Sequence, residues 1–176
     1  MLTQNQNKMK KLLSMALVVA TFFLASCSKE EATPSASWKL GSTTYNQALT
    51  IKQPTGVFVQ YLALDKIYTS AELSNNSNST KTFNGFRVFF KTAPTTAGTY
   101  KIVLRSDASL LAADEMMFAM QDVTRNKEYI SSNTTVVANV TVNAGKISVV
   151  IPATKVQEVG TQTPEVLEAS GTFVEQ

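Results

Sequence analysis

The chain contains few residues that could carry catalytic chemistry. It has no histidine, and its only thiol is that of Cys27, so neither a Ser-His-Asp triad nor a Cys-His pair can be assembled from it. Zinc sites built from His and Cys are excluded for the same reason. Carboxylates and lysines are the only groups left for acid–base catalysis.

One group of carboxylates comprises Asp107, Asp114 and Glu115. Two acids at a set separation can cleave a glycosidic bond, and oxygen ligands of this kind bind Ca²⁺. Neighbouring residues of a strand point to opposite faces, so Asp114 and Glu115 cannot form the acid pair within a strand. No Asp-x-Asp spacing supports the calcium site. We therefore interpret these acids as a solvated loop rim, and we predict a protein that is not an enzyme and holds no metal or cofactor.

The residues before Cys27 give its thiol a different role. Lysines at positions 8, 10 and 11 precede an apolar run over residues 12–24, and small residues follow. This is the layout of a secretory signal peptide. The stretch Leu24-Ala25-Ser26-Cys27 resembles the lipobox of bacterial lipoproteins. The resemblance implies cleavage before Cys27, which then carries a diacylglyceryl group as the first mature residue.

The residues after Cys27 extend this resemblance. Lys29, Glu30 and Glu31 follow one serine and resemble the Lys-(Asp/Glu)₂ surface-export signal of Bacteroidota lipoproteins. The resemblance implies an outer-membrane protein whose domain faces the cell exterior. The alternative is a solvated, charged start to a linker.

Charge and length support lipid as the only anchor. The apolar run has 13 residues, whereas a membrane-spanning helix needs about 20. The net charge of +3 comes from the three lysines of the signal segment, because the rest of the chain has 13 Lys and Arg against 13 Asp and Glu. No basic face remains, which argues against a nucleic-acid partner. The expected membrane contact is the N-terminal lipid alone.

We expect three segments: a removed signal peptide (1–26), a lipidated cysteine with a short tether (27–37), and one domain (38–176). Beyond Trp38 apolar residues alternate with polar ones, as in residues 86–90 and 100–104, which indicates half-buried strands. The pattern predicts an all-β fold, a single β-sandwich of about eight to ten mostly antiparallel strands. An up-and-down β-barrel is the alternative.

Four local expectations depart from simple strands. Residues Ser106 to Asp114 form the one expected helix, and Val156 to Pro164 form a long loop. A three-residue turn over 143–145 closes a hairpin. The final strand, Gly171 to Val174, provides a free edge that could pair with a partner.

Short motifs in the domain resemble those of small all-β surface lipoproteins of Bacteroidota. They are Trp38-Lys39-Leu40-Gly41, Ala97-Gly98-Thr99-Tyr100, Gly145-Lys146-Ile147 and Ser170-Gly171-Thr172-Phe173. This resemblance implies a fold and a location, and it carries no catalytic residue with it.

Three aromatic residues are the candidates for ligand binding. Trp38 and Tyr45 could form a platform for sugars, or they could fill one end of the sandwich, which we favour. Phe89 falls on the same strand face as Arg87 and Lys91, so it is either covered by another layer or exposed as a contact point.

These observations favour a non-catalytic, surface-displayed binding domain whose ligand is a glycan or another envelope protein. The second hypothesis is a structural accessory subunit that docks through a sheet edge. A carboxylate-based hydrolase is the least favoured interpretation.

Overall fold

The computed structural model describes residues 36–176. The lipobox with Cys27, and the Lys29–Glu31 signal, lie outside the described residues. The strands are, in chain order, β1 (Ser37–Leu40), β2 (Thr43–Asn46), β3 (Leu49–Pro54), β4 (Val59–Leu64), β5 (Gly85–Phe90), β6 (Gly98–Ile102), β7 (Glu115–Asp122), β8 (Lys127–Ser131), β9 (Val137–Asn143), β10 (Lys146–Glu158) and β11 (Val166–Val174). Helix α2 (Ser70–Ser74) and a 3₁₀ helix (Ala108–Leu110) complete the described elements. None of the helices in this part of the chain could span a bilayer.

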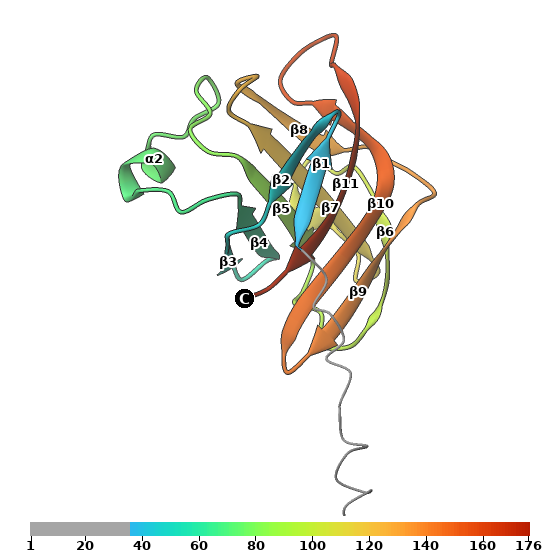
Figure 1. The fold of residues 1–176 in the computed structure, drawn as a ribbon. Helices are drawn as coiled ribbons and strands as arrows, with labels where there is room; N and C mark the ends of the chain where they lie inside the picture. The colour runs from blue at the N-terminus through green and yellow to red at the C-terminus, as the bar shows by residue number, and fades with distance from the viewer. Residues whose placement is uncertain (1–35) are drawn as a thin grey trace, which may run out of the picture. The chain divides into compact units, whose positions relative to one another are not determined.

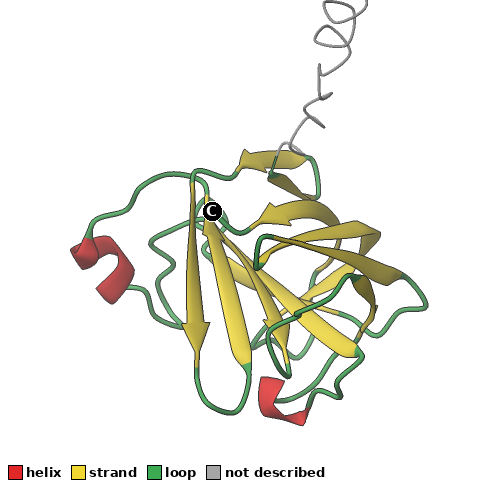
Figure 2. Ribbon diagram, turned by 90° about the horizontal axis from the view of Figure 1, so that it is seen from below, coloured by secondary structure: helices red, strands yellow, loops and turns green. Residues whose placement is uncertain are grey.

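All 11 strands belong to one sheet that folds back on itself (Figures 1 and 2). Its order is β2-β1-β11-β10-β9-β6-β7-β5-β4-β3, and β8 pairs with both β10 and β7. The strands β10, β9, β6, β7 and β8 therefore close a hydrogen-bonded ring, while β2 and β3 remain open edges. Only the β6–β7 pairing is parallel. The predicted all-β, mostly antiparallel fold is confirmed, and it combines a sandwich with partial barrel closure.

The two open arms of the sheet pack face to face through aromatic side chains. The Trp38 ring on β1 lies 5.9 Å from that of Phe86 on β5, and Tyr61 on β4 lies 5.8 Å from Phe173 on β11. Gly171 makes this approach possible, because a β-carbon there would lie 2.9 Å from Cβ of Trp38. Inward residues of both arms thus form one continuous core.

The last strand is not an edge, so that prediction is wrong. β11 lies between β1 and β10 and pairs with both. The loop expected over 156–164 is also too long, because β10 continues to Glu158. The register of β10 against β11 shifts between Ile151 and Thr154. This irregularity interrupts the alternation of inward and outward side chains from which the strand was predicted.

The predicted helix over 106–114 reduces to the three-residue 3₁₀ helix. Asp107 caps it by accepting a hydrogen bond from the Ser109 amide at 2.7 Å, and the backbone becomes extended at Leu111. Leu111 is buried, so packing overrides helical propensity here. Helix α2 was missed, although Thr69 and Glu72 form a capping box at its start, a signal visible in the sequence.

The β9–β10 hairpin has a two-residue turn, not the three-residue turn expected. Asn143 pairs with Lys146, and both Ala144 (φ 50°) and Gly145 (φ 78°) have left-handed backbones. Such turns match the right-handed twist of the flanking strands, and that match outweighs the cost of a left-handed alanine.

Candidate functional site

The proposed aromatic platform is not present on the surface. Trp38 is 1% exposed and Tyr45 is 9% exposed, and their rings stack with centroids 5.5 Å apart. The two residues are direct partners in the β1–β2 register, so both side chains point into the core. The platform interpretation is therefore wrong, and the core interpretation of Trp38 is confirmed.

Phe89 lies on the outer face of β5 and is half-buried. It belongs to a small apolar cluster with Phe58 and Met117, over which the segment containing Ala108 and Leu111 packs. The Phe58 and Phe89 rings are 6.2 Å apart. Of the two alternatives for Phe89, cover by another layer is the one that this packing supports.

Each of the three candidate carboxylates has a partner that keeps it ionised. The hydrogen bond to Ser109 lowers the pKa of Asp107, and Lys101, 2.8 Å away, lowers that of Asp114. The amide of Ala112 and then the guanidinium of Arg105 lower the pKa of Glu115. An ionised carboxylate cannot donate a proton, so the arrangement suits structural roles rather than general acid catalysis.

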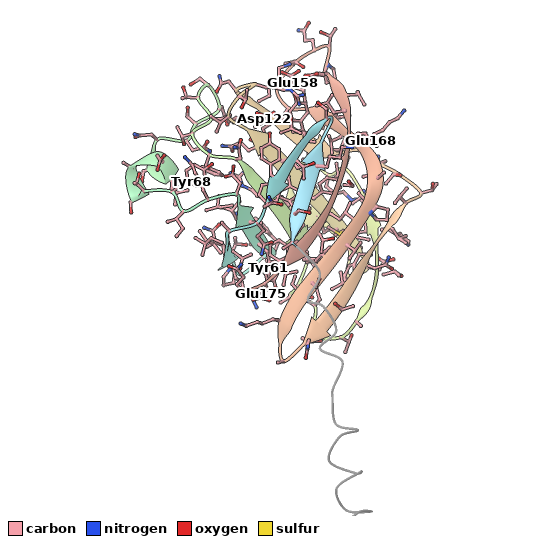
Figure 3. All side chains as sticks on the ribbon, in the orientation of Figure 1. Tyr61, Tyr68, Asp122, Glu158, Glu168 and Glu175 are labelled. Atoms are coloured by element: carbon pink, nitrogen blue, oxygen red, sulfur yellow. The ribbon has the colours of Figure 1, made fainter. Side chains whose placement is uncertain are left out.

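A polar pocket of about 380 Å³ lies elsewhere, where three connections meet. It is formed by the segment after α2, the β7–β8 turn and the loop between β10 and β11, and is lined by Asn78, Lys81, Asn126, Lys127, Glu128, Glu158, Val159, Gly160 and Thr161. In the view of Figure 3, Glu158 and Asp122 lie at one end of the sheet, and Tyr61 and Glu175 lie towards the other. None of the candidates from the sequence lines this pocket.

Asn126 fixes the first wall of the pocket. It has a left-handed backbone in the β7–β8 turn (φ 55°), which asparagine tolerates. Its side chain accepts a hydrogen bond from the Lys81 amide at 2.7 Å and donates one to the Ser79 carbonyl at 2.9 Å. These bonds hold the segment after α2 against the turn.

Lys81 supplies a nearly buried ammonium group in this wall. Its side chain is 5% exposed, and Nζ lies 3.3 Å from Oε2 of Glu128. Nζ also donates to the Ser77 carbonyl at 3.0 Å. The other oxygen of Glu128 accepts a hydrogen bond from Arg87 at 3.0 Å. Glu128 is thus shared by two cations.

The opposite wall has the reverse arrangement of charge: one lysine is shared by two glutamates. Lys127 Nζ lies 3.0 Å from Glu158 and 2.9 Å from Glu165, and these contacts raise its pKa. The Tyr129 hydroxyl donates to Glu165 at 2.8 Å; burial and then this bond raise the pKa of Tyr129 to about 12. Glu165 therefore ties the far end of the β10–β11 loop to β8.

The charges around the pocket cancel. Three cations (Lys81, Arg87 and Lys127) face three anions (Glu128, Glu158 and Glu165) in the ion pairs described above. Among residues 36–176 no group of three or more acidic or cysteine side chains is arranged to hold a metal ion. The pocket therefore offers adjacent hydrogen-bond donors and acceptors instead of a net field.

The Glu165 contacts predict a pH-dependent stability. Hydrogen bonds from Lys127 and then Tyr129 lower the pKa of Glu165 below its usual 4.5. Because the pKa of Glu165 is lower in the folded state than in the unfolded state, its ionised form stabilises the fold at pH values above the unfolded-state pKa. This stabilisation is lost as the pH falls through the folded-state pKa. We expect Glu165→Gln to lower Tm at neutral pH, with the difference from the native chain shrinking below about pH 4.5.

Thermal unfolding followed by circular dichroism at a series of pH values measures this difference. The control is Glu168→Gln, since Glu168 is exposed on β11. A Tm difference for Glu165→Gln that stays constant across the series would contradict the assignment.

The sequence contained little that could have located this pocket. Lys81 and Glu158 are far apart in the chain, and only the ring closure through β8 brings their elements together. Gly160, with a left-handed backbone (φ 85°), marks a turn in the loop but not a site.

Comparisons with known proteins returned no match: no family model, no curated protein and no solved structure is similar to this chain at a significant level.

Proposed function

We propose that this chain is a lipid-anchored lipoprotein of the bacterial outer membrane, displayed on the cell surface, whose β domain binds a ligand without catalysing a reaction. The lipobox ending in Cys27 and the charged residues Lys29, Glu30 and Glu31 support the location. The charge-balanced polar pocket supports binding, and it is the observation that carries this part of the proposal.

The position of the pocket suits a tethered binding domain. Ser37, the first residue of β1, pairs with Thr172 of β11, and Thr172 pairs in turn with Val150 of β10. Glu158 lies eight residues farther along β10, which corresponds to roughly 20–25 Å of strand. An anchor attached before β1 therefore leaves the pocket well away from the point of attachment.

The chemistry of the pocket is the ground for proposing that the domain does not catalyse a reaction. Its two carboxylates, Glu128 and Glu158, are each held by a lysine within about 3.3 Å. An acid pair that cleaves a glycosidic bond needs two carboxyl groups that reach the substrate, whereas both of these carboxylates serve as the partners of lysines.

Docking of an accessory subunit through a sheet edge is not the function that the structure favours. β2 has four residues, and β3 presents Lys52 and ends at Pro54. Short edge strands, lysine and proline are the features by which proteins prevent pairing at an edge. Beside β3, the Gln176 amide donates a hydrogen bond to the Thr50 hydroxyl, which occupies part of this edge.

The location is tested by expressing the full chain in a Bacteroidota host that is fed an alkyne fatty acid. We expect the native chain to incorporate the label, to sediment with outer membranes and to be degraded when intact cells are treated with protease. Cys27→Ser should lose the label and the membrane association. The matched control, Ser26→Ala, keeps a small residue before the cysteine and should retain both.

Replacement of Lys29, Glu30 and Glu31 by alanine separates anchoring from display. We expect this variant to keep the label but to resist protease on intact cells. Unchanged degradation would remove the support for surface display, and retained labelling of Cys27→Ser would overturn the lipid anchor.

A further inference from the structure

The polar pocket has features that specify a class of ligand. We infer that it takes a neutral, hydroxyl-rich molecule of one or two sugar rings. This inference rests on the proposed binding function and names its ligand.

Charge excludes the simplest alternative, a small ion. Every ammonium and carboxylate group that lines the pocket already has an oppositely charged partner within 3.3 Å. A charged ligand would have to displace one of these partners and leave it desolvated without compensation, which is costly for a group as buried as Lys81. A neutral ligand leaves both ion-pair groups intact.

Several polar groups of the pocket form no side-chain hydrogen bond within the described part of the protein, and their chemistry suits the hydroxyl groups of a ligand. Within residues 36–176, no side-chain hydrogen bond engages the amide of Asn78, the hydroxyl of Thr161 or Oε1 of Glu158, while Oε2 of Glu158 is bound by Lys127. A carboxylate oxygen accepts, and an amide and a hydroxyl both donate and accept. A sugar hydroxyl, which can donate to one neighbour and accept from another, satisfies such a mixed set.

The size and lining of the pocket agree with this class. About 380 Å³ lies at the small end of the range for small-molecule sites. No aromatic side chain lines it, and Val159 is the only large apolar one. Recognition must therefore depend on hydrogen bonds rather than on ring stacking, which makes single side-chain replacements informative.

The experiment is a titration of the isotope-labelled full chain, followed by backbone amide chemical shifts. The neutral probes are glucose, galactose, N-acetylglucosamine, cellobiose and lactose; the charged analogues are glucuronate and glucosamine. We expect at least one neutral probe to shift the amides of Gly160 and Thr161 saturably, and the charged analogues to bind more weakly. Asn78→Ala should weaken that binding by about 2- to 10-fold, the loss of one neutral hydrogen bond.

A matched control lies on the outer face of the sheet. Asn139→Ala removes the same side chain from an exposed position on β9, outside the pocket lining, and should leave the affinity unchanged. Tighter binding of glucuronate or glucosamine than of the neutral sugars would overturn the inferred class while leaving binding at the pocket intact. No shift with any of these probes would also overturn it. The proposed binding function itself fails only if a soluble extract of the cell envelope also leaves the Gly160 and Thr161 amides unshifted.

Discussion

Replacement of Phe86 by alanine should lower the free energy of unfolding by about 3–5 kcal/mol, the cost of emptying a large aromatic site in a core. Phe86 is fully buried and packs between the two arms of the sheet. Its ring centroid lies 5.9 Å from those of both Trp38 and Phe118, edge-on to the latter. The cavity would therefore open at the point where the arms meet.

The site has little capacity to collapse around the smaller residue. Gly171 lies opposite Phe86, and a β-carbon on that glycine would come within 3.0 Å of Cε1 of the ring. The backbone of β11 cannot move inwards, because β1 and β10 hold it on both sides. A cavity that cannot relax carries the upper part of the expected cost.

Urea unfolding monitored by Trp38 fluorescence measures the loss, since Trp38 is the only tryptophan. Phe89→Ala is the matched control: it removes the same side chain from the same strand, but on the half-buried outer face. We expect it to cost about 1–2 kcal/mol. Equal losses for the two variants would show that the inner face of β5 is not the principal core.

The strands and their inner faces could be predicted from the sequence because local alternation determines them. Residues 86–90 alternate as expected, with Phe86, Val88 and Phe90 fully buried. The core role of Trp38 was predicted on a different ground, the tendency of large aromatic residues to be buried. Fold class follows from such patterns without knowledge of which strands pair.

Strand order and the pocket could not be predicted because they depend on long-range pairing. The edge position assigned to Gly171–Val174 assumed that the last strand lies outermost, whereas it inserts between β1 and β10. The irregularity after Ile151 hid the second half of β10, and with it Glu158. Polar residues such as Lys81 and Glu128 show no periodic signal, so their convergence emerges only in the folded chain.

The second large effect is expected at the centre of the pocket wall. Glu128→Ala should lower the free energy of unfolding by about 2–4 kcal/mol. Removing one member of a fully buried ion pair costs about 3–5 kcal/mol, and the figure here is lower because Glu128 and Arg87 side chains are 22% and 20% exposed. Lys81, only 5% exposed, bears most of the penalty, since its ammonium loses its carboxylate and has little access to water.

Two comparison variants separate loss of the ion pair from loss of side-chain volume. Glu168→Ala removes the same side chain from an exposed position on β11 and should change stability by less than about 0.5 kcal/mol. The triple replacement Lys81→Met, Arg87→Met and Glu128→Leu removes all three charges together. We expect it to be more stable than Glu128→Ala, because no unpaired charge remains. Chemical denaturation of the three proteins gives the values, and a triple variant no more stable than Glu128→Ala would contradict the charge argument.

The same variants separate the requirements of the fold from those of ligand recognition. Asn78, Thr161 and Glu158 remain in the triple variant, so it should fold and still bind a sugar, but more weakly, because methionine and leucine offer the ligand no hydrogen bonds at positions 81 and 128 of the pocket lining. Natural chains retain buried charges at some cost in stability where those charges are needed for specificity. A triple variant that folds well and binds with unchanged affinity would mean that the Lys81–Glu128–Arg87 group serves only the structure, and that recognition depends on Asn78, Thr161 and Glu158 alone.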